Sequence, residues 1–494
     1  MNAPNELKFP PLLDSSLFRN QSYVNGEWVE ADSRMRFDID NPADGTIIAS
    51  VPDCGAAETR RAIAAANAAL PAWRAMTAKQ RATLLRRWYD LMLLNADDLA
   101  LILTTEQGKP LAEAKGEIIY GASFIEWFAE EGKRIYGDVI PPHMNDKRLI
   151  VIKQPIGVTA AITPWNFPNA MIARKVAPAL AAGCTMVIKP AEQTPLSALA
   201  MAELAHRAGI PKGVLNIVTG SASSSVVIGK EFCANPIVRK LSFTGSTEVG
   251  RILMRQSADT IKKLSLELGG NAPFIVFDDA DLDAAADGLM QSKYRNAGQT
   301  CVSANRIYVQ AAVYEAFAAK VQTKMVSLKV GRGTDAGVNI GPLIDEQGLA
   351  KVEAHLADAI AKGATVVSGG QRHALGGRFY EPTLLTNVPK SATISKEETF
   401  GPVAPLIKFD TENEAITLAN DSEFGLAAYF YSRDVGRVFR VGEALESGMV
   451  GINTGIFSNE VAPFGGVKQS GLGREGSKYG IEDYLEIKYL CLNV

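Results

Sequence analysis

The stretch that decides the fold is residues 157–218, which read GVTAAITPWNFPNAMIARKVAPALAAGCTMVIKPAEQTPLSALAMAELAHRAGIPKGVLNIV. Three short runs rich in apolar and β-branched residues, Val158–Ile162, Thr185–Ile188 and Leu215–Val218, alternate in it with longer helical segments. This alternation is typical of right-handed βαβ units, which build a parallel sheet. Ligands of such sheets bind beyond the carboxyl ends of the strands.

The same alternation continues toward the C-terminus. A fourth strand is predicted at Lys240–Phe243, and a second series follows with strands at Phe274–Phe277 and Arg306–Val309 around a helix over residues 281–296. A chain of 494 residues is also too long for one ordinary core. We therefore expect two α/β lobes that meet near Gly269-Gly270, with a cleft between them.

The segments outside the two lobes have patterns of their own. Residues 53–108 read as helical, with Thr77 and Gln80 at the spacing of a capping box. Thr194 is a suitable cap for the helix that follows it. The alternating runs Lys147–Gln154 and Tyr484–Leu492 predict a β-extension that pairs within the protein or across a subunit interface.

Composition excludes several classes of protein. Apolar residues make up 47% and charged residues 21%, which is the balance of a globular protein, and a net charge of −3 without a basic block argues against nucleic acid as a partner. The first 18 residues lack a signal-peptide pattern, and no segment is apolar enough to span a membrane. The five cysteines and four histidines lack metal-ligand spacing. We expect a protein of the reducing cytoplasm without a metal site or a membrane partner.

Cys301 is the best candidate nucleophile. It ends the small and polar segment NAGQTC (residues 296–301), which should come close to other backbone without enclosing the sulfur in an apolar core. A buried structural thiol is the alternative, and it is the better interpretation for Cys184 in its apolar strand. The pattern by itself leaves the two interpretations of Cys301 equally good.

Glu267 is a candidate general base. In LSLELGG (residues 264–270) the period of two puts the leucines on one face of a strand and the glutamate on the other. A partly buried carboxyl would have its pKa raised toward neutrality, as base catalysis requires. An amphipathic strand whose polar face meets water explains the pattern equally well.

The loop FTGSTEVG (residues 243–250) follows a strand and opens a helix. Its amide hydrogens and the helix dipole could receive a pyrophosphate. The signal is weak, because the usual G-x-G-x-x-G pattern is missing from this turn.

Six motifs, in order along the chain, resemble the aldehyde dehydrogenase superfamily: PWNFP (164–168), KPAE (189–192), FTGS (243–246), ELGG (267–270), GQTC (298–301) and ETFGP (398–402). The resemblance covers nearly the whole chain. KQPIGV (153–158) and GREGSKYGIEDY (473–484) are similar to the bacterial members that oxidise succinate semialdehyde. The family resemblance favours Cys301 as nucleophile and Glu267 as base over the structural alternatives.

The resemblance implies an α/β fold with three parts. A Rossmann-type dinucleotide-binding domain would comprise residues 1–136 and 157–267, and an α/β catalytic domain residues 268–459. Residues 460–480 would return to the cofactor domain. Residues 137–156 and 481–494 would form a small β-extension for oligomerisation, giving a homodimer or a homotetramer.

The resemblance also implies a mechanism. The thiolate of Cys301 attacks the aldehyde, hydride passes to the nicotinamide, and water cleaves the thioester. The side-chain amide of Asn166 and the backbone N–H of Cys301 would stabilise the oxyanion. Glu267 would activate the thiol, the water or both, and Lys175 and Glu475 would relay protons behind it.

For the cofactor, the resemblance implies NAD(P). Glu192 could bond the free ribose hydroxyls and would repel a 2′-phosphate, whereas many bacterial relatives of the semialdehyde subgroup have serine there. NAD is therefore expected to be preferred, with NADP possible because Lys189 is near. The implied cofactor-binding set is Ile162, Thr163, Pro164, Trp165, Asn166, Lys189, Ala191, Glu192, Gly220, Phe243, Gly245, Ser246, Val249, Leu268, Gly269, Glu398 and Phe400.

For the substrate, the resemblance implies that Arg174, Arg295 and Ser458 hold the far carboxylate of succinate semialdehyde. From spacing alone, a structural ion pair is the better interpretation of either arginine. Glutarate semialdehyde, one methylene longer, is the first alternative substrate. Two further alternatives are a fold relative without activity and a coenzyme A-acylating dehydrogenase, although Glu267 favours hydrolysis. Many relatives of the semialdehyde subgroup carry a second cysteine two places after the nucleophile, where this chain has Ser303.

Overall fold

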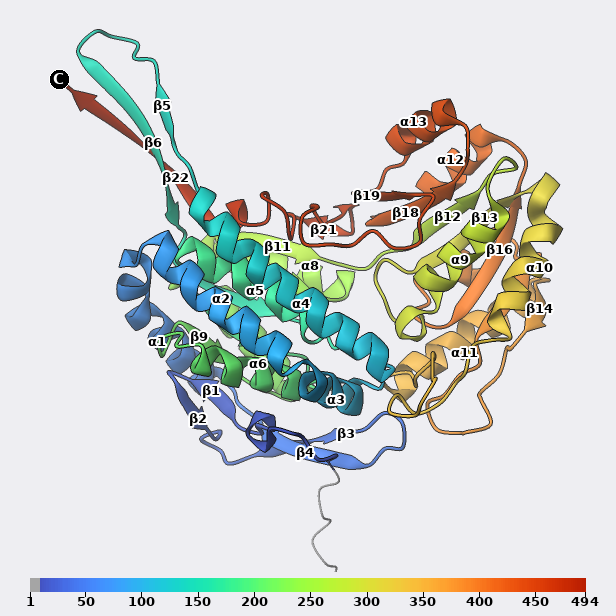
Figure 1. Ribbon diagram of the computed structural model, residues 1–494, viewed down its shortest axis with the longest axis horizontal. Coiled ribbons are helices and arrows are strands. Elements are labelled where there is room, and N and C mark those ends of the chain that lie inside the picture. Colours follow the sequence, from blue (N-terminus) through green and yellow to red (C-terminus); the bar gives the residue numbers. More distant parts are fainter. Residues whose placement is uncertain (1–8) are drawn as a thin grey trace, which may run out of the picture.

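The computed structural model describes residues 9–494 and contains two α/β bodies with a β-extension that projects from one of them (Figure 1). Among the described residues, no helix has both the length and the apolar character needed to cross a bilayer. The same residues hold no group of three or more histidine, cysteine or acidic side chains placed to bind a metal.

The first body is built on an eight-stranded sheet, and its central strands are buried on both faces. In spatial order its strands are β2 (Glu27–Val29), β1 (Ser22–Val24), β9 (Leu215–Ile217), β8 (Thr185–Lys189), β7 (Val158–Ile162), β10 (Val238–Thr244), β11 (Lys263–Glu267) and β21 (Gly471–Leu472). The five strands from β9 to β11 run parallel. The strands predicted from sequence are therefore confirmed.

The order β9-β8-β7-β10-β11 contains a switch point, because the chain leaves β7 in one direction for β8 and β9 and continues on the other side with β10. At such a point the loops after the two neighbouring strands part and leave a crevice for a ligand. This arrangement confirms the Rossmann-type expectation and directs attention to the ends of β7, β8 and β10.

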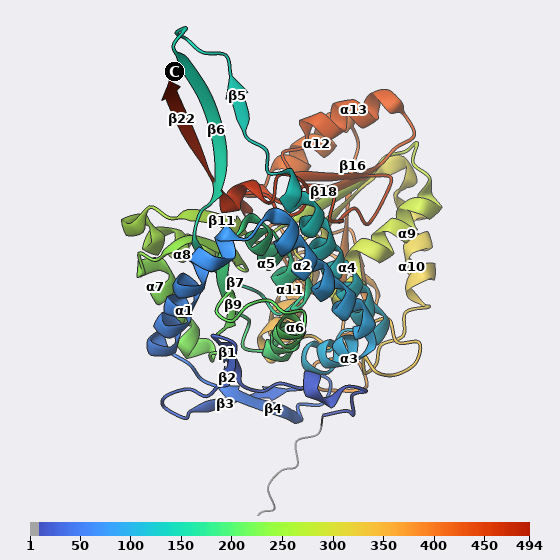
Figure 2. The same ribbon diagram turned by 60° about the vertical axis from the view of Figure 1, so that its left-hand side comes forward.

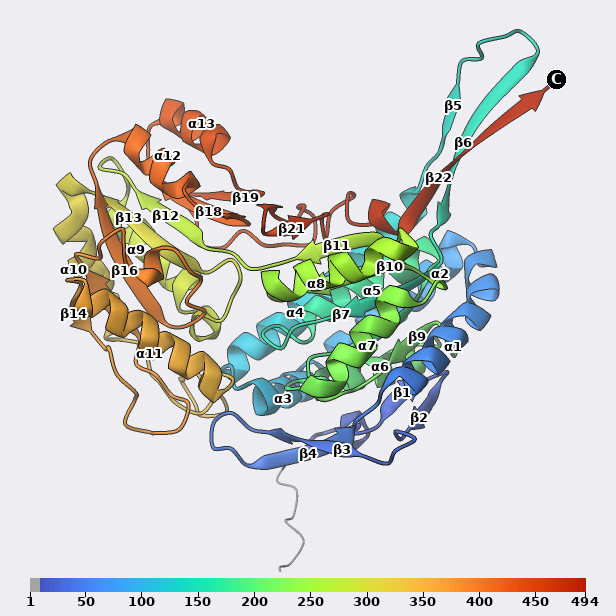
Figure 3. The same ribbon diagram turned by 180° about the vertical axis from the view of Figure 1, so that it is seen from behind.

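Helices cover both faces of this sheet (Figures 1 and 3). One face carries α5 (Ala170–Ala182) and α6 (Pro195–Arg207), over which pack α2 (Ala78–Leu94), α3 (Ala96–Gln107) and α4 (Leu111–Glu131). Figure 3 shows α1 (Ala56–Ala75), α7 (Ala222–Ala234) and α8 (Thr247–Ser257) on the other face. Beside this body lies a hairpin of β3 (Arg36–Asp40) and β4 (Ile47–Pro52).

Two helix caps test the local predictions. Thr77 and Gln80 form the predicted capping box at the start of α2. The prediction for Thr194 is wrong, because its hydroxyl makes no hydrogen bond although it is buried. Instead, the carboxylate of Glu106 accepts the Leu196 and Ser197 N–H groups at 2.8 Å each. A buried acid from α3 thus caps α6 across the helix layer, which local sequence cannot reveal.

The second body has a seven-stranded sheet. Its order is β14 (Thr365–Ser368), β15 (Thr383–Thr386), β16 (Val403–Phe409), β13 (Ala304–Gln310), β12 (Ala272–Val276), β18 (Ala427–Tyr431) and β19 (Met449–Ile452). Its helices are α9 (Leu282–Lys293), α10 (Tyr314–Met325), α11 (Glu346–Ala361), α12 (Glu412–Asn420) and α13 (Val435–Ala444). Since β11 of the first sheet ends at Glu267 and β12 begins at Ala272, the chain crosses between the bodies at Gly269-Gly270, as predicted.

The extension is a three-stranded antiparallel sheet that stands clear of both bodies (Figures 1 and 2). Its order is β22 (Leu485–Asn493), β6 (Lys147–Pro155) and β5 (Asp138–Ile140). β22 pairs with β6 along its whole length, so the two alternating runs of the sequence pair within the chain. The other edge of β22 faces no strand of residues 9–494. A short ladder of β17 (Phe424–Gly425) and β20 (Val467–Lys468) completes the strands.

Candidate active site between the two bodies

Cys301 lies in the loop between the short 3-10 helix η4 (Arg295–Gly298) and β13, at the amino end of that strand. Two glycines let this loop touch its neighbours. A Cβ on Gly298, whose φ is +76°, would lie 2.2 Å from the Gly401 carbonyl oxygen. A Cβ on Gly270 would lie 2.4 Å from the carbonyl oxygen of Cys301. The expected close approach of this segment to other backbone is therefore confirmed.

The thiol of Cys301 faces a cavity of about 280 Å³. Burial raises its pKa to about 12, and the negative charge of Glu398 adds to the shift while Arg174 opposes it. At neutral pH the group is therefore a thiol, and a nearby base must remove the proton before the sulfur can act as a nucleophile.

Glu267 ends β11, and its side chain is buried, with 4% of the residue exposed. Burial raises the pKa of its carboxyl well above the usual 4.5, the charge of Glu475 raises it further, and Arg174 and Lys175 oppose the shift. Its Oε2 has no hydrogen-bond partner among residues 9–494. The alternative of a polar strand face in water is thus wrong, and the raised pKa makes the carboxyl a stronger base than an ordinary glutamate.

Glu475 is the second buried acid of the site, and two cations contact it. The Lys175 ammonium donates to Glu475 Oε1 and, at 2.6 Å, to the hydroxyl of Thr244. Arg174 Nε lies 2.8 Å from Glu475 Oε2. Burial alone would raise the pKa of Glu475, but the charges of Lys175 and Arg174 outweigh it and hold the pKa below its usual value. Glu475 is therefore the ionised member of this buried pair of acids.

Asn166 follows β7 on the loop before α5 and is 6% exposed. Its Nδ2 donates to the backbone oxygen of Gln299 at 3.1 Å. This contact joins the predicted oxyanion amide, carried by the first body, to the cysteine loop of the second body. The Asn166 amide therefore lies against the loop that carries Cys301, although the two residues are 135 positions apart in the chain.

Arg174, Arg295 and Ser458 line the same cavity as Cys301. The two arginines differ in their partners. Arg174 makes the ion pair with Glu475 and packs on the ring of Phe464, with 3.8 Å from its Cζ to the ring centroid. Arg295 has no carboxylate within 4.0 Å anywhere in the described part of the chain, and lies over the Phe167 ring at 5.3 Å. The structural ion pair considered for both is present for Arg174 alone.

Sequence reasoning missed one wall of the cavity. Lys109, Glu113, Glu117 and Tyr120 line it from the α3–α4 turn and from α4. Their spacing of four, four and three residues places them on one helical face, which was a readable signal. The turn at Gly108 indicates the end of a helix, and the polar face that follows it belongs to the next helix.

The residues predicted for the cofactor gather at the carboxyl end of the first sheet. Ile162 of β7 is in register with Lys189 of β8 and with Phe243 of β10. Gly245 and Ser246 follow β10 and open α8, where the Ser246 hydroxyl accepts the Val249 N–H at 3.3 Å. A Cβ on Gly245 would lie 2.4 Å from the Phe243 ring, so any larger residue in this turn would have to displace that ring. A tight turn at a helix N-terminus beside a switch point fits a dinucleotide pyrophosphate.

Three further contacts shape this region. Lys189 Nζ donates to Glu192 Oε2 at 3.0 Å, and the Glu192 side chain is 30% exposed while that of Lys189 is 3% exposed. The Gly270 N–H donates to Glu398 Oε1 at 3.2 Å, and burial raises the pKa of Glu398 to about 7. The rings of Trp165 and Phe400 meet edge to face at 5.5 Å. Residues 398–400, from the second body, therefore face the loop after β7.

The fold and the site together define a two-body α/β enzyme with a dinucleotide-type sheet and a cysteine that lines a cavity. Comparison with known proteins identifies its family. Residues 28–490 match the model of the aldehyde dehydrogenase family, and the chain belongs to that family of oxidoreductases.

Several relatives match nearly the full length. A glutarate-semialdehyde dehydrogenase of Pseudomonas aeruginosa is 69% identical over 97% of this chain and 99% of its own. An Escherichia coli succinate-semialdehyde dehydrogenase, named for NADP(+), is 69% identical over 98% of this chain and 100% of its own. The crystal structure of a succinate-semialdehyde dehydrogenase from Burkholderia pseudomallei has 66% identity and a TM-score of 0.97, and the match covers 98% of this chain and 100% of that one.

Proposed function

We propose that this protein oxidises a small semialdehyde that carries a carboxylate, with succinate semialdehyde as the substrate and glutarate semialdehyde as the alternative. The observation that carries the proposal is that one cavity is lined by Cys301 and by two arginines, of which Arg295 has no acidic partner within 4.0 Å among residues 9–494. The names of the two relatives at 69% identity support both substrates.

The first step requires a proton acceptor. Glu267 takes the proton of the Cys301 thiol, because its raised pKa makes it a far stronger base than an ordinary carboxylate. The sulfur then attacks the aldehyde carbon, and negative charge collects on the former carbonyl oxygen. The Asn166 amide and the Cys301 N–H donate to that oxygen, and each such donor is worth about 3–4 kcal/mol in the transition state.

When bound, NAD(P) would accept a hydride from that carbon, and a thioester would then remain on Cys301. Once the thiol proton has left it, Glu267 removes a proton from water, which cleaves the thioester and releases the acid. The Cys301 sulfur then regains a proton. Lys175 and Glu475 lie behind Glu267 and pass the proton on. In this scheme residues 1–136 and 157–267 bind the cofactor, residues 268–459 carry the nucleophile, and residues 460–480 return Glu475 to the first body.

Arg295 and Ser458 are proposed to hold the far carboxylate of the substrate. The guanidinium of Arg295 offers a planar fork that matches a carboxylate. Arg174 contributes from beside them, since its Nη2 is buried and has no acceptor within the described chain. Because the charge of Arg174 is already partly neutralised by Glu475, Arg174 attracts the substrate carboxylate less strongly. Arg295 is therefore the main determinant of carboxylate binding.

The test compares succinate semialdehyde with butanal, a neutral aldehyde of the same carbon number. Arg295→Ala is expected to raise KM for succinate semialdehyde about 100-fold, since a charged hydrogen bond is worth about 1.5–3 kcal/mol, and to leave KM for butanal within about threefold. Equal losses for both aldehydes would show that Arg295 maintains the pocket and does not recognise the carboxylate. A pocket of this kind separates glutarate from succinate semialdehyde by only about 1–3 kcal/mol, so rates for both belong in the same experiment.

We further propose that NAD is preferred over NADP, which remains usable. The carboxylate of Glu192 is held by Lys189 beside the predicted site of the adenosine ribose, where it would repel a 2′-phosphate. The E. coli relative named for NADP(+) argues for measuring both cofactors side by side.

The extension is proposed to join copies of this chain into a homodimer or homotetramer. Val139, Ile487 and Tyr489 are 84%, 71% and 55% exposed on it, and the edge of β22 carries unpaired backbone groups in residues 9–494. Light scattering after gel filtration tests this, and deletion of residues 485–494 should yield monomers.

A further inference from the structure

Lys109 is a buried cation that the mechanism above does not use. It sits in the turn between α3 and α4 and is 2% exposed. Its ammonium donates to Glu117 Oε2 at 2.6 Å and to the backbone oxygen of Asn166 at 2.7 Å. The third side of the ammonium faces the ring of Phe167, 3.8 Å from the centroid. Two oxygens of the protein therefore accept from the ammonium, and an aromatic ring covers its third side.

The acceptor is the informative part of this contact, because it is the carbonyl of the residue whose amide faces the cysteine loop. Asn296 Nδ2 donates to the same Asn166 oxygen at 3.0 Å and also to the oxygen of Gln299 at 3.2 Å. Gln299 in turn accepts the Asn166 amide. The backbone and the side chain of Asn166 are thus tied to one short segment, residues 296–299, directly before Cys301.

Glu117 fixes the other side of the same residue. Its Oε1 accepts the N–H groups of Asn169 at 2.9 Å and Ala170 at 3.2 Å, at the start of α5. The ion pair of Lys109 and Glu117 therefore holds both ends of the loop from Asn166 to Asn169 by hydrogen bonds to its backbone. A site that stabilises an oxyanion needs its donor held to a fraction of an ångström, because a donor that can move gives less in the transition state.

We propose that Lys109, together with Glu117, is a positioning residue that holds the Asn166 amide against the cysteine loop. The proposal rests on the oxyanion role of Asn166 that is part of the proposed function. Lys109 does not touch the reacting atoms, and its effect reaches them through the backbone of Asn166. It is distinct from a substrate-binding cation, because it serves every aldehyde and not only those with a carboxylate.

The experiment compares Lys109→Met with Lys262→Met in the full-length protein. Lys262 is a matched control, since its buried ammonium also holds backbone oxygens, those of Phe232, Asn235 and Val238 at 2.8, 3.1 and 3.1 Å, away from the cavity. Lys109→Met is expected to lower kcat about 10- to 100-fold for succinate semialdehyde and butanal alike. Lys262→Met should change kcat less than about threefold.

A second readout separates positioning from general damage. Alkylation of Cys301 by iodoacetamide needs the thiol and its base but builds no oxyanion. Its rate in Lys109→Met is expected to stay within about threefold of the parent. Since loss of Lys109 leaves the Glu117 charge buried and unpaired, the double variant Lys109→Met with Glu117→Gln removes that charge, and the same loss of kcat is expected.

Three results would overturn the proposal. An unchanged kcat in both Lys109 variants would show that Asn166 is held without the ion pair. A loss confined to succinate semialdehyde would make Lys109 a substrate ligand. Parallel losses of kcat and alkylation would mean that the whole site has collapsed. Asn166→Ala serves as the reference: if that variant keeps full kcat, it is the oxyanion role of Asn166 that fails, whatever Lys109 does.

Discussion

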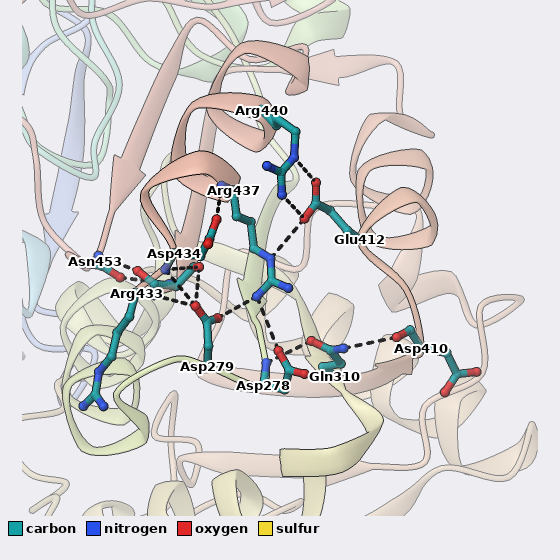
Figure 4. Close-up of polar contacts among 11 residues, drawn as sticks. Asp278, Asp279, Gln310, Asp410, Glu412, Arg433, Asp434, Arg437, Arg440 and Asn453 are labelled. Carbon is teal, nitrogen blue, oxygen red and sulfur yellow. Dashed lines mark hydrogen bonds and ion pairs between the residues drawn. The ribbon is translucent and has the colours of Figure 1, made fainter.

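Two charge networks of this protein use the same residue types in opposite surroundings. Figure 4 shows the surface network, in which Glu412 accepts from Arg437 at 3.0 Å and from Arg440 at 2.9 Å. Hydrogen bonds from Arg440 hold the pKa of Glu412 below its usual value. In the buried network between the bodies, burial raises the pKa of Glu267 well above its usual value. Location, and not residue type, decides whether the carboxyl is an anion or holds a proton.

The buried network contains two acids and two cations, and the cations are not shared equally between the acids. Both cations, Lys175 and Arg174, contact Glu475, which keeps its pKa low. Glu267 has neither as a direct partner and is left to burial and to the charge of Glu475. Because both cations contact Glu475, that acid is ionised, whereas the raised pKa of Glu267 lets it accept a proton. On the surface, Glu412 shares Arg437 with Asp279 and also has Arg440.

The largest expected effect on kcat comes from replacing the sulfur of Cys301. Cys301→Ser should lower kcat by about 1000-fold or more, because a serine hydroxyl is far less acidic than a thiol and Glu267 cannot deprotonate it efficiently. Steady-state NADH formation measures the loss. Retention of more than a tenth of the parent rate would contradict the assignment of Cys301 as the nucleophile.

The second prediction concerns the pH dependence of kcat/KM, and it is tested by removing the acid that binds both cations. Glu267 acts as a base only when deprotonated, so kcat/KM should fall as pH drops through its raised pKa, well above the 4.5 of an ordinary glutamate. Glu475→Gln removes the neighbouring negative charge that helps to raise this pKa, so the acid limb should move to lower pH. A profile of kcat/KM against pH for the parent and the variant tests the sign.

Two outcomes bear on that prediction. A limb that stays in place would mean that burial alone sets the pKa of Glu267, and a limb that moves to higher pH would contradict the coupling. Glu267→Gln is the reference, with kcat expected to be about 100-fold lower and the acid limb absent, since proton transfer by a positioned base contributes about 10²- to 10⁴-fold.

A third prediction uses a pair between the two extremes, that of Lys189 and Glu192, in which one partner is buried and the other is 30% exposed. Glu192→Ser removes the charge that would repel a 2′-phosphate and frees the lysine to meet it. The ratio of kcat/KM for NADP to that for NAD should rise about tenfold, which corresponds to about 1.4 kcal/mol. A ratio unchanged within twofold would separate Glu192 from cofactor choice.

The sequence predicted the strands and the crossing between the bodies because these depend on local patterns. The runs Val158–Ile162 and Thr185–Ile188 are apolar on both faces and become central strands, and the glycine pair at 269–270 marks the passage to the second sheet. The family motifs likewise named Cys301 and Glu267, which the fold then brings to the same place.

Partners that come from distant parts of the chain could not be predicted in this way. Glu106 caps α6 from 90 positions away, and the ion pair of Arg174 with Glu475 spans 301 positions. Such contacts depend on how helices pack across a layer, and many positions with the same local pattern lack them. The pKa of Glu267 has the same origin, since it depends on which neighbour takes the cations.

The smallest expected effect lies in the surface network. Arg437 contacts Asp279 at 2.6 Å, Glu412 at 3.0 Å and the ring of Phe277 at 4.6 Å, and its side chain is 20% exposed. Arg437→Met should lower the free energy of unfolding by only about 1 kcal/mol, because pairs in contact with water gain little over their hydrated state. Thermal unfolding in about 0.05 M and about 1 M NaCl measures this, and the difference between parent and variant should shrink in high salt as the charges are screened. The kcat should not change, and a loss of activity from this site would break the distinction between a network that only stabilises and one that sets the chemistry.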